Sequence, residues 1–168
     1  MRSAASSKRS SSVHSIGAYV ARPPVWNAAY GKAPLLHTST FGGNELACAA
    51  ALAALDVLHD EGLVENARAR GAQLLDGARA LQARYPDVIA EVRGAGLLVG
   101  VELRSEGYGG TIIPELLKRG VTAAWTLNQQ RVIRLEPPLV VTADEVDTAL
   151  RALDGAVAAA FDTLGMLA

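Results

Sequence analysis

The stretch that decides the fold is VIAEVRGAGLLVGVEL, residues 88–103. Its β-branched residues and the two glycines at positions 94 and 96 predict a short strand over residues 88–92, a turn, and a second strand over residues 97–103. The second strand is almost entirely apolar. We therefore expect it to be buried on both faces of a sheet.

Two further strands are expected over residues 121–125 and 131–135, so the first pair belongs to a small mixed sheet. A helix over residues 111–119 is expected between the two pairs. Residues 142–145, Thr-Ala-Asp-Glu, form a capping-box pattern, and a stripe of apolar residues runs on from it to residue 164. The chain is therefore expected to end in an amphipathic helix.

Two long helices are expected before the sheet. Asn44 is a suitable N-cap for the apolar pattern over residues 46–58, and Gly62 separates this pattern from a second one over residues 63–85. Hairpin-like strands with helices gathered on one face predict an α+β layer architecture.

The composition excludes several classes of protein. Of the 168 residues, 50% are hydrophobic, and the 31 Ala and 22 Leu exclude disorder over most of the chain. The 16 basic and 17 acidic residues nearly cancel, so neither nucleic acid nor a membrane surface is expected as a partner. One cysteine excludes a disulfide framework, and no apolar run approaches the ~20 residues of a membrane span. We expect a cytoplasmic protein.

Residues 1–15 differ from the rest, because they hold seven Ser, three basic residues and no acid. A transit peptide has such a composition, but the serines at positions 10–12 resist the amphipathic helix that a transit peptide forms. The alternatives are a disordered tail and a segment unrelated to the fold behind it. We expect the segment to be disordered.

Residues 38–44 offer a loop that suits an anion. Three hydroxyls (Thr38, Ser39 and Thr40) and two glycines precede a predicted helix. The first N–H groups of a helix have no internal partners and lie at the positive end of its dipole, so the loop suits a phosphate or a carboxylate. The alternative is a plain N-cap loop that only starts the helix.

Arg134 is the second candidate, in VIRLEPPL at residues 132–139. Its guanidinium stands among apolar strand residues before a rigid Pro-Pro, and arginine fixes a carboxylate by two parallel hydrogen bonds. The alternative is a structural ion pair with Glu136 or another acid. Arg93 also suits an anion, although we expect it to pair within the fold. The three histidines share no metal-ligand spacing, so no metal site is expected.

Three segments, taken in order, resemble the class III pyridoxal-phosphate aminotransferases, a family that includes the ornithine, acetylornithine and putrescine aminotransferases. The segments are HTSTFGGN with ACAA (residues 37–44 and 47–50), VRGAGLL (residues 92–98) and IRLEPPL (residues 133–139). The resemblance covers about residues 16–165. Within the family, residues 125–128 leading into Arg134 look most like putrescine aminotransferase.

The resemblance implies that residues 60–168 form the small C-terminal domain of a fold-type I pyridoxal-phosphate enzyme. Residues 16–59 would form the end of the large domain, with the phosphate-binding loop and a long interdomain helix. Ser39 and Thr40 would bind the cofactor phosphate in the active site of the neighbouring subunit of a homodimer. Arg134 would bind a substrate carboxylate. The implied reaction moves an amino group from a diamine or ω-amino acid, of putrescine or ornithine type, to 2-oxoglutarate.

The family also uses a Schiff-base lysine and an aspartate at the pyridine nitrogen. Lys8 lies eight residues ahead of Ile16, a spacing that one branch of the family accepts, but serines follow it where the family has glycines. The aspartate and a glycine-rich phosphate loop lie upstream in family members. This chain by itself is therefore expected to be an inactive fragment.

Two other interpretations stay open. The chain could be a non-catalytic remnant that acts at most as an oligomerisation or small-anion-binding domain, or it could be an independent ligand-binding module. In either case the Ala-rich helix over residues 46–58 predicts exposed apolar surface and self-association.

Overall fold

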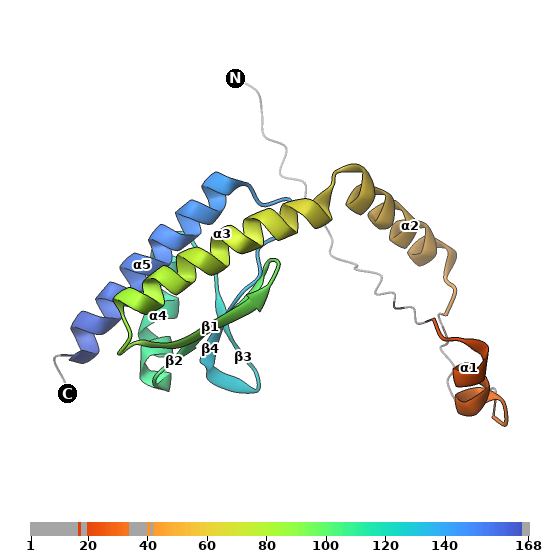
Figure 1. Cartoon of the computed structure of the whole chain (residues 1–168), viewed down its shortest axis with the longest axis horizontal. Helices are drawn as coiled ribbons and strands as arrows, with labels where there is room; N and C mark the ends of the chain where they lie inside the picture. Colours follow the sequence, from red (N-terminus) through yellow and green to blue (C-terminus); the bar gives the residue numbers. More distant parts are fainter. Residues whose placement is uncertain (1–16, 18–19, 34–39, 41, 166–168) are drawn as a thin grey trace, which may run out of the picture. The chain divides into compact units, whose positions relative to one another are not determined.

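The computed structural model in Figure 1 describes residues 17, 20–33, 40 and 42–165. By its internal contacts the chain divides into two units, residues 1–57 and residues 58–168. The described part of the first unit holds helix α1 (Pro23–Tyr30) and most of helix α2 (Glu45–Asp60). Of the residues in these two helices, Ala47 alone is buried.

Gly62 ends α2 and starts helix α3 (Leu63–Arg84), as predicted. Its backbone φ is +62°, a left-handed conformation that glycine adopts without steric cost. The N–H of Gly62 donates to the carbonyl oxygen of His59 at 3.2 Å. The boundary between α2 and α3 is therefore built into the sequence.

The sheet of the second unit has the order β1-β2-β4-β3 and is antiparallel throughout. This confirms the α+β class but corrects the mixed sheet expected from the sequence. Strand β2 and strand β3 do run parallel, yet β4 lies between them, so they form no parallel pair. The strands are β1 (Ile89–Ala95), β2 (Leu98–Leu103), β3 (Ala124–Thr126) and β4 (Gln129–Leu135).

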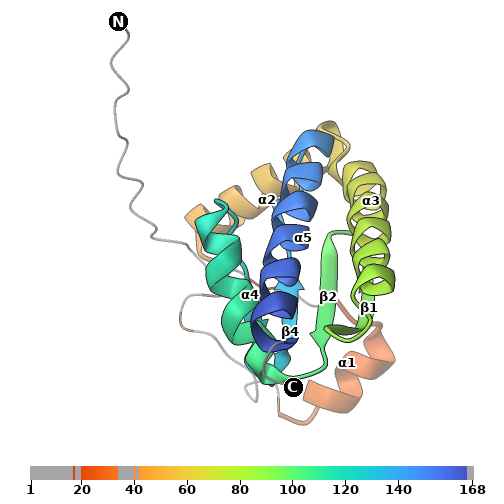
Figure 2. The same ribbon diagram turned by 90° about the vertical axis from the view of Figure 1, so that its left-hand side faces the viewer.

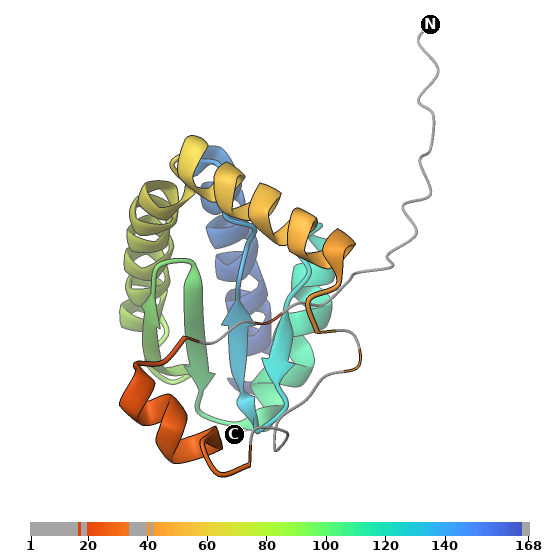
Figure 3. The ribbon, with the colours of Figure 1, turned by 90° about the vertical axis from the view of Figure 1, so that its right-hand side faces the viewer.

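Three helices cover one face of this sheet: α3, α4 (Glu106–Lys118) and α5 (Ala143–Gly165). Figure 2 shows the helices in front of the strands, and Figure 3 shows the strands from the opposite side. Aliphatic side chains from all three helices pack on the strands. The core includes Leu74, Leu81, Val99, Val101, Ile112, Leu116, Ile133, Leu153 and Val157.

Strand β2 is buried on one face only, which corrects the expectation of burial on both. Val99, Val101 and Leu103 are buried in the core, whereas Leu98 on the other face is 57% exposed. The three helices occupy a single side of the sheet. The sign of this in the sequence is Glu102, a charged residue between the buried Val101 and Leu103, whereas Gly100 adds no polar side chain to the alternation. We call the side that α3, α4 and α5 leave uncovered the open face.

Helix α4 begins at Glu106, five residues before the expected start. The first turns of α4 were not predicted from the sequence because they contain three glycines, at positions 107, 109 and 110, and glycine is a poor helix former. A Cβ at Gly109 would meet the carbonyl oxygen of Gln130 at 3.5 Å, so the helix lies close to β4 there. Strand β3 is shorter than expected, since residues 121–123 are not in a strand.

The capping box of α5 is present. The hydroxyl of Thr142 accepts from the N–H of Glu145 at 3.3 Å, and the Glu145 carboxylate accepts from the N–H of Thr142 at 2.8 Å. The Glu145 carboxylate also accepts from the Thr142 hydroxyl. Together these bonds from Thr142, the backbone N–H first, hold the pKa of Glu145 below its ordinary value.

This capping box predicts an acid-sensitive contribution to stability. Because the pKa of Glu145 is lower in the folded state, the contribution is complete above the unfolded-state pKa of about 4.3 and is lost as the pH falls through the lower folded-state pKa. Glu145→Gln should lower Tm near neutral pH and narrow the Tm difference between about pH 7 and about pH 3. Thermal unfolding followed by circular dichroism measures both. If the Tm of Glu145→Gln depended on pH as steeply as the Tm of the parent chain, Glu145 would not be the source of the acid-sensitive contribution.

Candidate active site

The predicted anion loop lies at the N-terminus of α2. Thr40 and residues 42–46 line a shallow hollow, and Gly43 turns the chain there with φ of +72°. Asn44 is the N-cap, as expected: its side-chain oxygen accepts from the N–H of Ala47 at 3.0 Å. Ser39, the other predicted phosphate ligand, lies outside the described residues.

The hollow offers a hydroxyl and two backbone donors to an anion. The N–H groups of Glu45 and Leu46 belong to the first turn of α2, where no earlier helical carbonyl reaches them. The carboxylate of Glu45 lines the same hollow and stabilises the helix dipole, but it opposes a second negative charge. The loop therefore combines donor groups and one acidic side chain at the start of a helix.

Arg134 lies on β4 and points to the open face of the sheet. Its neighbours across the two adjoining strands are Gly100 on β2 and Ala124 on β3. Residues paired across antiparallel strands share a face, so the arginine is flanked there by the two smallest residue types. Its side chain is 46% exposed, and its Nη2 lies 2.9 Å from Oε1 of Glu136. The ion pair with Glu136, left open by the sequence, is therefore formed.

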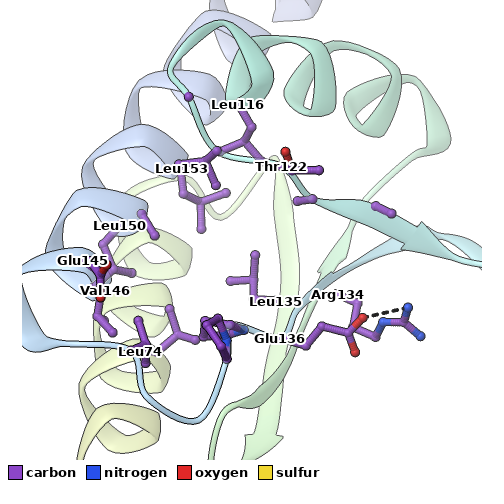
Figure 4. Close-up of a pocket in the computed structure, with 18 residues that line it drawn as sticks. Leu74, Leu116, Thr122, Arg134, Leu135, Glu136, Glu145, Val146, Leu150 and Leu153 are labelled. Carbon is purple, nitrogen blue, oxygen red and sulfur yellow. Dashed lines mark ion pairs between the residues drawn. The ribbon is translucent and has the colours of Figure 1, made fainter. Parts of the chain in front are cut away.

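Arg134 lines a partly open pocket of about 600 Å³. Its walls are mostly aliphatic and come from β4, α5 and the segments before β3 and after β4, with Leu74 of α3 and Leu116 of α4. In Figure 4, Leu135 points towards Leu116 and Leu153, whereas the side chains of Arg134 and Glu136 extend together away from these leucines. Arg134 and Glu136 are themselves among the residues that line the pocket, and their side chains extend away from its leucines.

Arg93 pairs within the fold, as expected. It donates to Glu91 at 2.9 Å and to Glu102 at 2.7 Å, and Arg131 lies 3.6 Å from Glu102. The hydrogen bond to Glu102 and the charge of Glu91 raise the pKa of the Arg93 guanidinium. Arg93 therefore belongs to a charge network between neighbouring strands, and its carboxylate partners come from the chain itself.

The segment after the Pro-Pro pair is held by a residue that the sequence did not indicate. The side-chain amide of Asn66, on α3, donates to the carbonyl oxygens of Leu139 at 2.7 Å and Val141 at 3.0 Å. These groups are more than seventy residues apart in sequence, so no local pattern could reveal the contact. Asn66 fixes where the chain runs as it leaves β4 for α5.

No group of three or more metal-binding side chains occurs among the described residues, and none of the helices they form is long and apolar enough to span a membrane. Lys8, the candidate for the Schiff-base lysine, lies outside the described residues. The described lysines, Lys32 and Lys118, do not line the α2 hollow.

The chain is similar to known aminotransferases in sequence and in structure. A family model, "Aminotransferase class-III", matches residues 5–157. The ornithine aminotransferase of Toxoplasma gondii is 38% identical with a TM-score of 0.70, over 77% of this chain and 31% of that chain. The acetylornithine aminotransferase of Elizabethkingia anophelis is 35% identical with a TM-score of 0.67, over 73% of this chain and 30% of that chain.

An amine transaminase from an uncultivated Pseudomonas species, solved with pyridoxal phosphate bound, is 36% identical with a TM-score of 0.67, over 75% of this chain and 30% of that chain. The chain thus spans about a third of the length of the solved structures that it matches. Its small antiparallel sheet with three covering helices corresponds to a domain of a fold-type I pyridoxal-phosphate enzyme. Because the family match extends over most of the sequence, this chain belongs to the class III aminotransferases, which use pyridoxal phosphate.

Proposed function

We propose that this chain supplies the C-terminal part of an aminotransferase that moves an amino group from a diamine or ω-amino acid to 2-oxoglutarate. In this proposal residues 60–168 are the small domain, and residues 16–59 are the end of the large domain with the interdomain helix. The protein acts as a cytoplasmic homodimer. The observation that carries the proposal is Arg134: a half-exposed strand arginine, flanked by Gly100 and Ala124, within the family match.

Arg134 binds the carboxylate of the substrate in this proposal. A guanidinium presents a planar fork of N–H donors that matches both oxygens of a carboxylate. The small residues at positions 100 and 124 leave room beside that fork on the open face. The rigid Pro137-Pro138 and the hydrogen bonds from Asn66 fix the chain that follows. The arginine is therefore held on a regular strand, where its direction is well defined.

Ser39 and Thr40 bind the cofactor phosphate of the neighbouring subunit. The described part of the loop fits that group, because the Thr40 hydroxyl and the first N–H groups of α2 are donors at the positive end of a helix. When bound, pyridoxal phosphate supplies the electron sink for amino transfer. Thr40 and Arg134 of one chain then serve two different active sites of the dimer, and the dimer is required for each site.

Binding of 2-oxoglutarate to the full chain, measured by isothermal titration calorimetry, tests the role of Arg134. Arg134→Gln removes the charge and the fork, and the affinity is expected to fall about tenfold or more. Arg79→Gln is the matched control, since Arg79 is an exposed arginine of α3 and should leave binding unchanged. Equal affinity in the Arg134→Gln and parent chains would overturn the proposed role.

Lys8 is the candidate for the Schiff-base lysine that this chain offers: it falls inside the residues 5–157 that match the family, although the serines at positions 10–12 stand where the family has glycines. Borohydride fixation of pyridoxal phosphate on the full chain, followed by peptide mass spectrometry, is expected to label Lys8 ahead of Lys32 and Lys118. Lys8→Arg removes the reactive amine, keeps the charge and should abolish that labelling. Equal labelling of all three lysines would count against Lys8 and favour a non-catalytic remnant.

A further inference from the structure

The chain that follows Arg134 borders open space. Residues 134–138 and Val141 line the partly open pocket of about 600 Å³. In a close-packed interior a segment is held by neighbours on every side, whereas a segment beside a pocket lacks contacts on one side. The direction of Arg134 therefore depends on how the chain is held beyond the end of β4.

Backbone hydrogen bonds give the next residues a shape but not a place in the domain. The last residue of β4 is Leu135, and the prolines at positions 137 and 138 have no N–H to donate. The N–H of Val141 donates to the carbonyl oxygen of Pro138 at 2.9 Å and closes a turn. Because this bond lies within the segment, other contacts must place the turn against the rest of the domain.

A side chain of α3 supplies such contacts. Val141 is buried in the core, but Leu139 is 41% exposed, so packing holds only one end of the turn. The side-chain amide of Asn66 donates to the carbonyl oxygens of Leu139 at 2.7 Å and Val141 at 3.0 Å, which uses both of its N–H groups. Helix α3 packs on β1, β2 and α5. Asn66 thus fastens the turn to a helix whose own position the core sets.

Gln73, two turns further along α3, offers a direct comparison. Its side chain is half-buried like that of Asn66, and its amide also donates to two acceptors. These are the carbonyl oxygen of Ala143 at 3.1 Å and the carboxylate of Asp147 at 2.6 Å, both on α5. Gln73 therefore ties α3 to α5 without touching the segment that follows Arg134.

We propose that Asn66 is a positioning residue for the carboxylate site at Arg134. This inference rests on the proposed function, in which Arg134 binds the substrate carboxylate. By holding the turn against α3, Asn66 fixes the exit of β4 and keeps residues 134–138 in one place beside the pocket. The guanidinium then keeps its direction, which matters because a contact with both oxygens of a carboxylate depends on the alignment of the two groups.

The test is isothermal titration calorimetry of the full chain with 2-oxoglutarate, at a temperature well below Tm. Asn66→Leu keeps the approximate size of the side chain, adds no charge and removes both donors. Its affinity is expected to fall about three- to tenfold relative to the parent chain, a change equivalent to about one net hydrogen bond.

Gln73→Met is the matched control. It also keeps the approximate size of an α3 side chain, adds no charge and removes two bonds to distant residues. Thermal unfolding should show similar falls in Tm for the two variants, whereas Gln73→Met should bind 2-oxoglutarate as the parent chain does. A role of Asn66 in stability alone would lower Tm and leave the affinity of the folded chain unchanged.

The outcomes separate this inference from the proposed function. If Arg134→Gln loses binding but Asn66→Leu binds as the parent chain does, the carboxylate role of Arg134 stands and the positioning role of Asn66 is wrong. If Asn66→Leu and Gln73→Met lose affinity equally, the loss follows from weaker packing of α3 and the positioning role is again wrong. If Asn66→Leu does not fold, Asn66→Ala takes its place in the same comparison. If Arg134→Gln binds as well as the parent chain, the proposed function fails at this residue and the inference fails with it.

Discussion

Replacing Gly71 with alanine is expected to destabilise the α3–sheet unit by about 1–3 kcal/mol or more. Gly71 is buried on α3 where the helix crosses the β1–β2 turn, and a Cβ there would lie 2.3 Å from the carbonyl carbon and oxygen of Gly96. These are backbone atoms of a turn in which Gly96 has φ of +53°, so they cannot rotate away as a side chain can. Helix and hairpin would have to separate.

Urea unfolding followed by circular dichroism measures this change. Gly110→Ala is the matched control, because Gly110 lies in helix α4 and a Cβ there would meet nothing within 4 Å. Alanine favours a helix over glycine by up to about 1 kcal/mol, so the control should gain stability. We therefore expect Gly71→Ala to lower the free energy of unfolding and Gly110→Ala to raise it. A Gly71→Ala chain as stable as the parent would mean that α3 and the turn are not in close contact.

Ile133→Ala is expected to lower the free energy of unfolding by about 2–5 kcal/mol. Ile133 is fully buried at the centre of β4, between Val101 on β2 and Trp125 on β3. It does not border the existing cavity, so its removal would leave a new void that well-packed neighbours cannot fill. A domain is stable by only about 5–15 kcal/mol, so this loss is a large part of the total.

Leu98→Ala is the control for this second substitution. Leu98 also lies on the sheet, but its side chain is on the open face and 57% exposed. Its truncation should change the free energy of unfolding by less than about 0.5 kcal/mol. Both values come from the same urea titration. Equal losses at the two positions would show that the open face is covered in solution, for example by a second copy of the chain.

Gly71→Ala and Ile133→Ala both act on the unit that carries Arg134, so they also test how the proposed carboxylate site is supported. Ile133 faces the core and Arg134 the open face because successive residues of a strand point to opposite sides. A loss of packing at Ile133 is therefore expected to reach Arg134 through the backbone of β4. The Arg134 pair itself is a surface contact and adds little to stability.

Local signals predicted the parts of the fold that local chemistry controls. The Thr142–Glu145 capping box was evident because its bonds join residues three apart, and Asn44 was found as an N-cap for the same reason. Gly62 ended a helix as expected, since the left-handed conformation is a property of one residue. The α+β class followed from the order of these elements and is confirmed.

The burial of β2, the order of the strands and the contacts of Asn66 depend on residues that are far apart in the sequence, and these features were not predicted correctly or at all. In β2, Glu102 alone indicated a solvent-facing side. The rest of the apolar run left open whether one face or two are buried, because burial depends on which sides of the sheet the helices cover. The insertion of β4 between β2 and β3 made the sheet antiparallel, and no residue pattern encodes that order. Asn66 reached Leu139 and Val141, in the segment between β4 and α5, only through the packing of α3 beside α5.

The sequence by itself determined the ends of α2, α3 and α5, the β1–β2 hairpin and the three family segments, because each depends on neighbouring residues and their intrinsic conformations. Only the tertiary structure decided that Arg134 stands on the open face between Gly100 and Ala124 and that its charge is met by Glu136. The sequence allowed a substrate ligand or an ion pair at that position. The physical reason is that the partner of a guanidinium depends on its direction and exposure, which strand pairing sets.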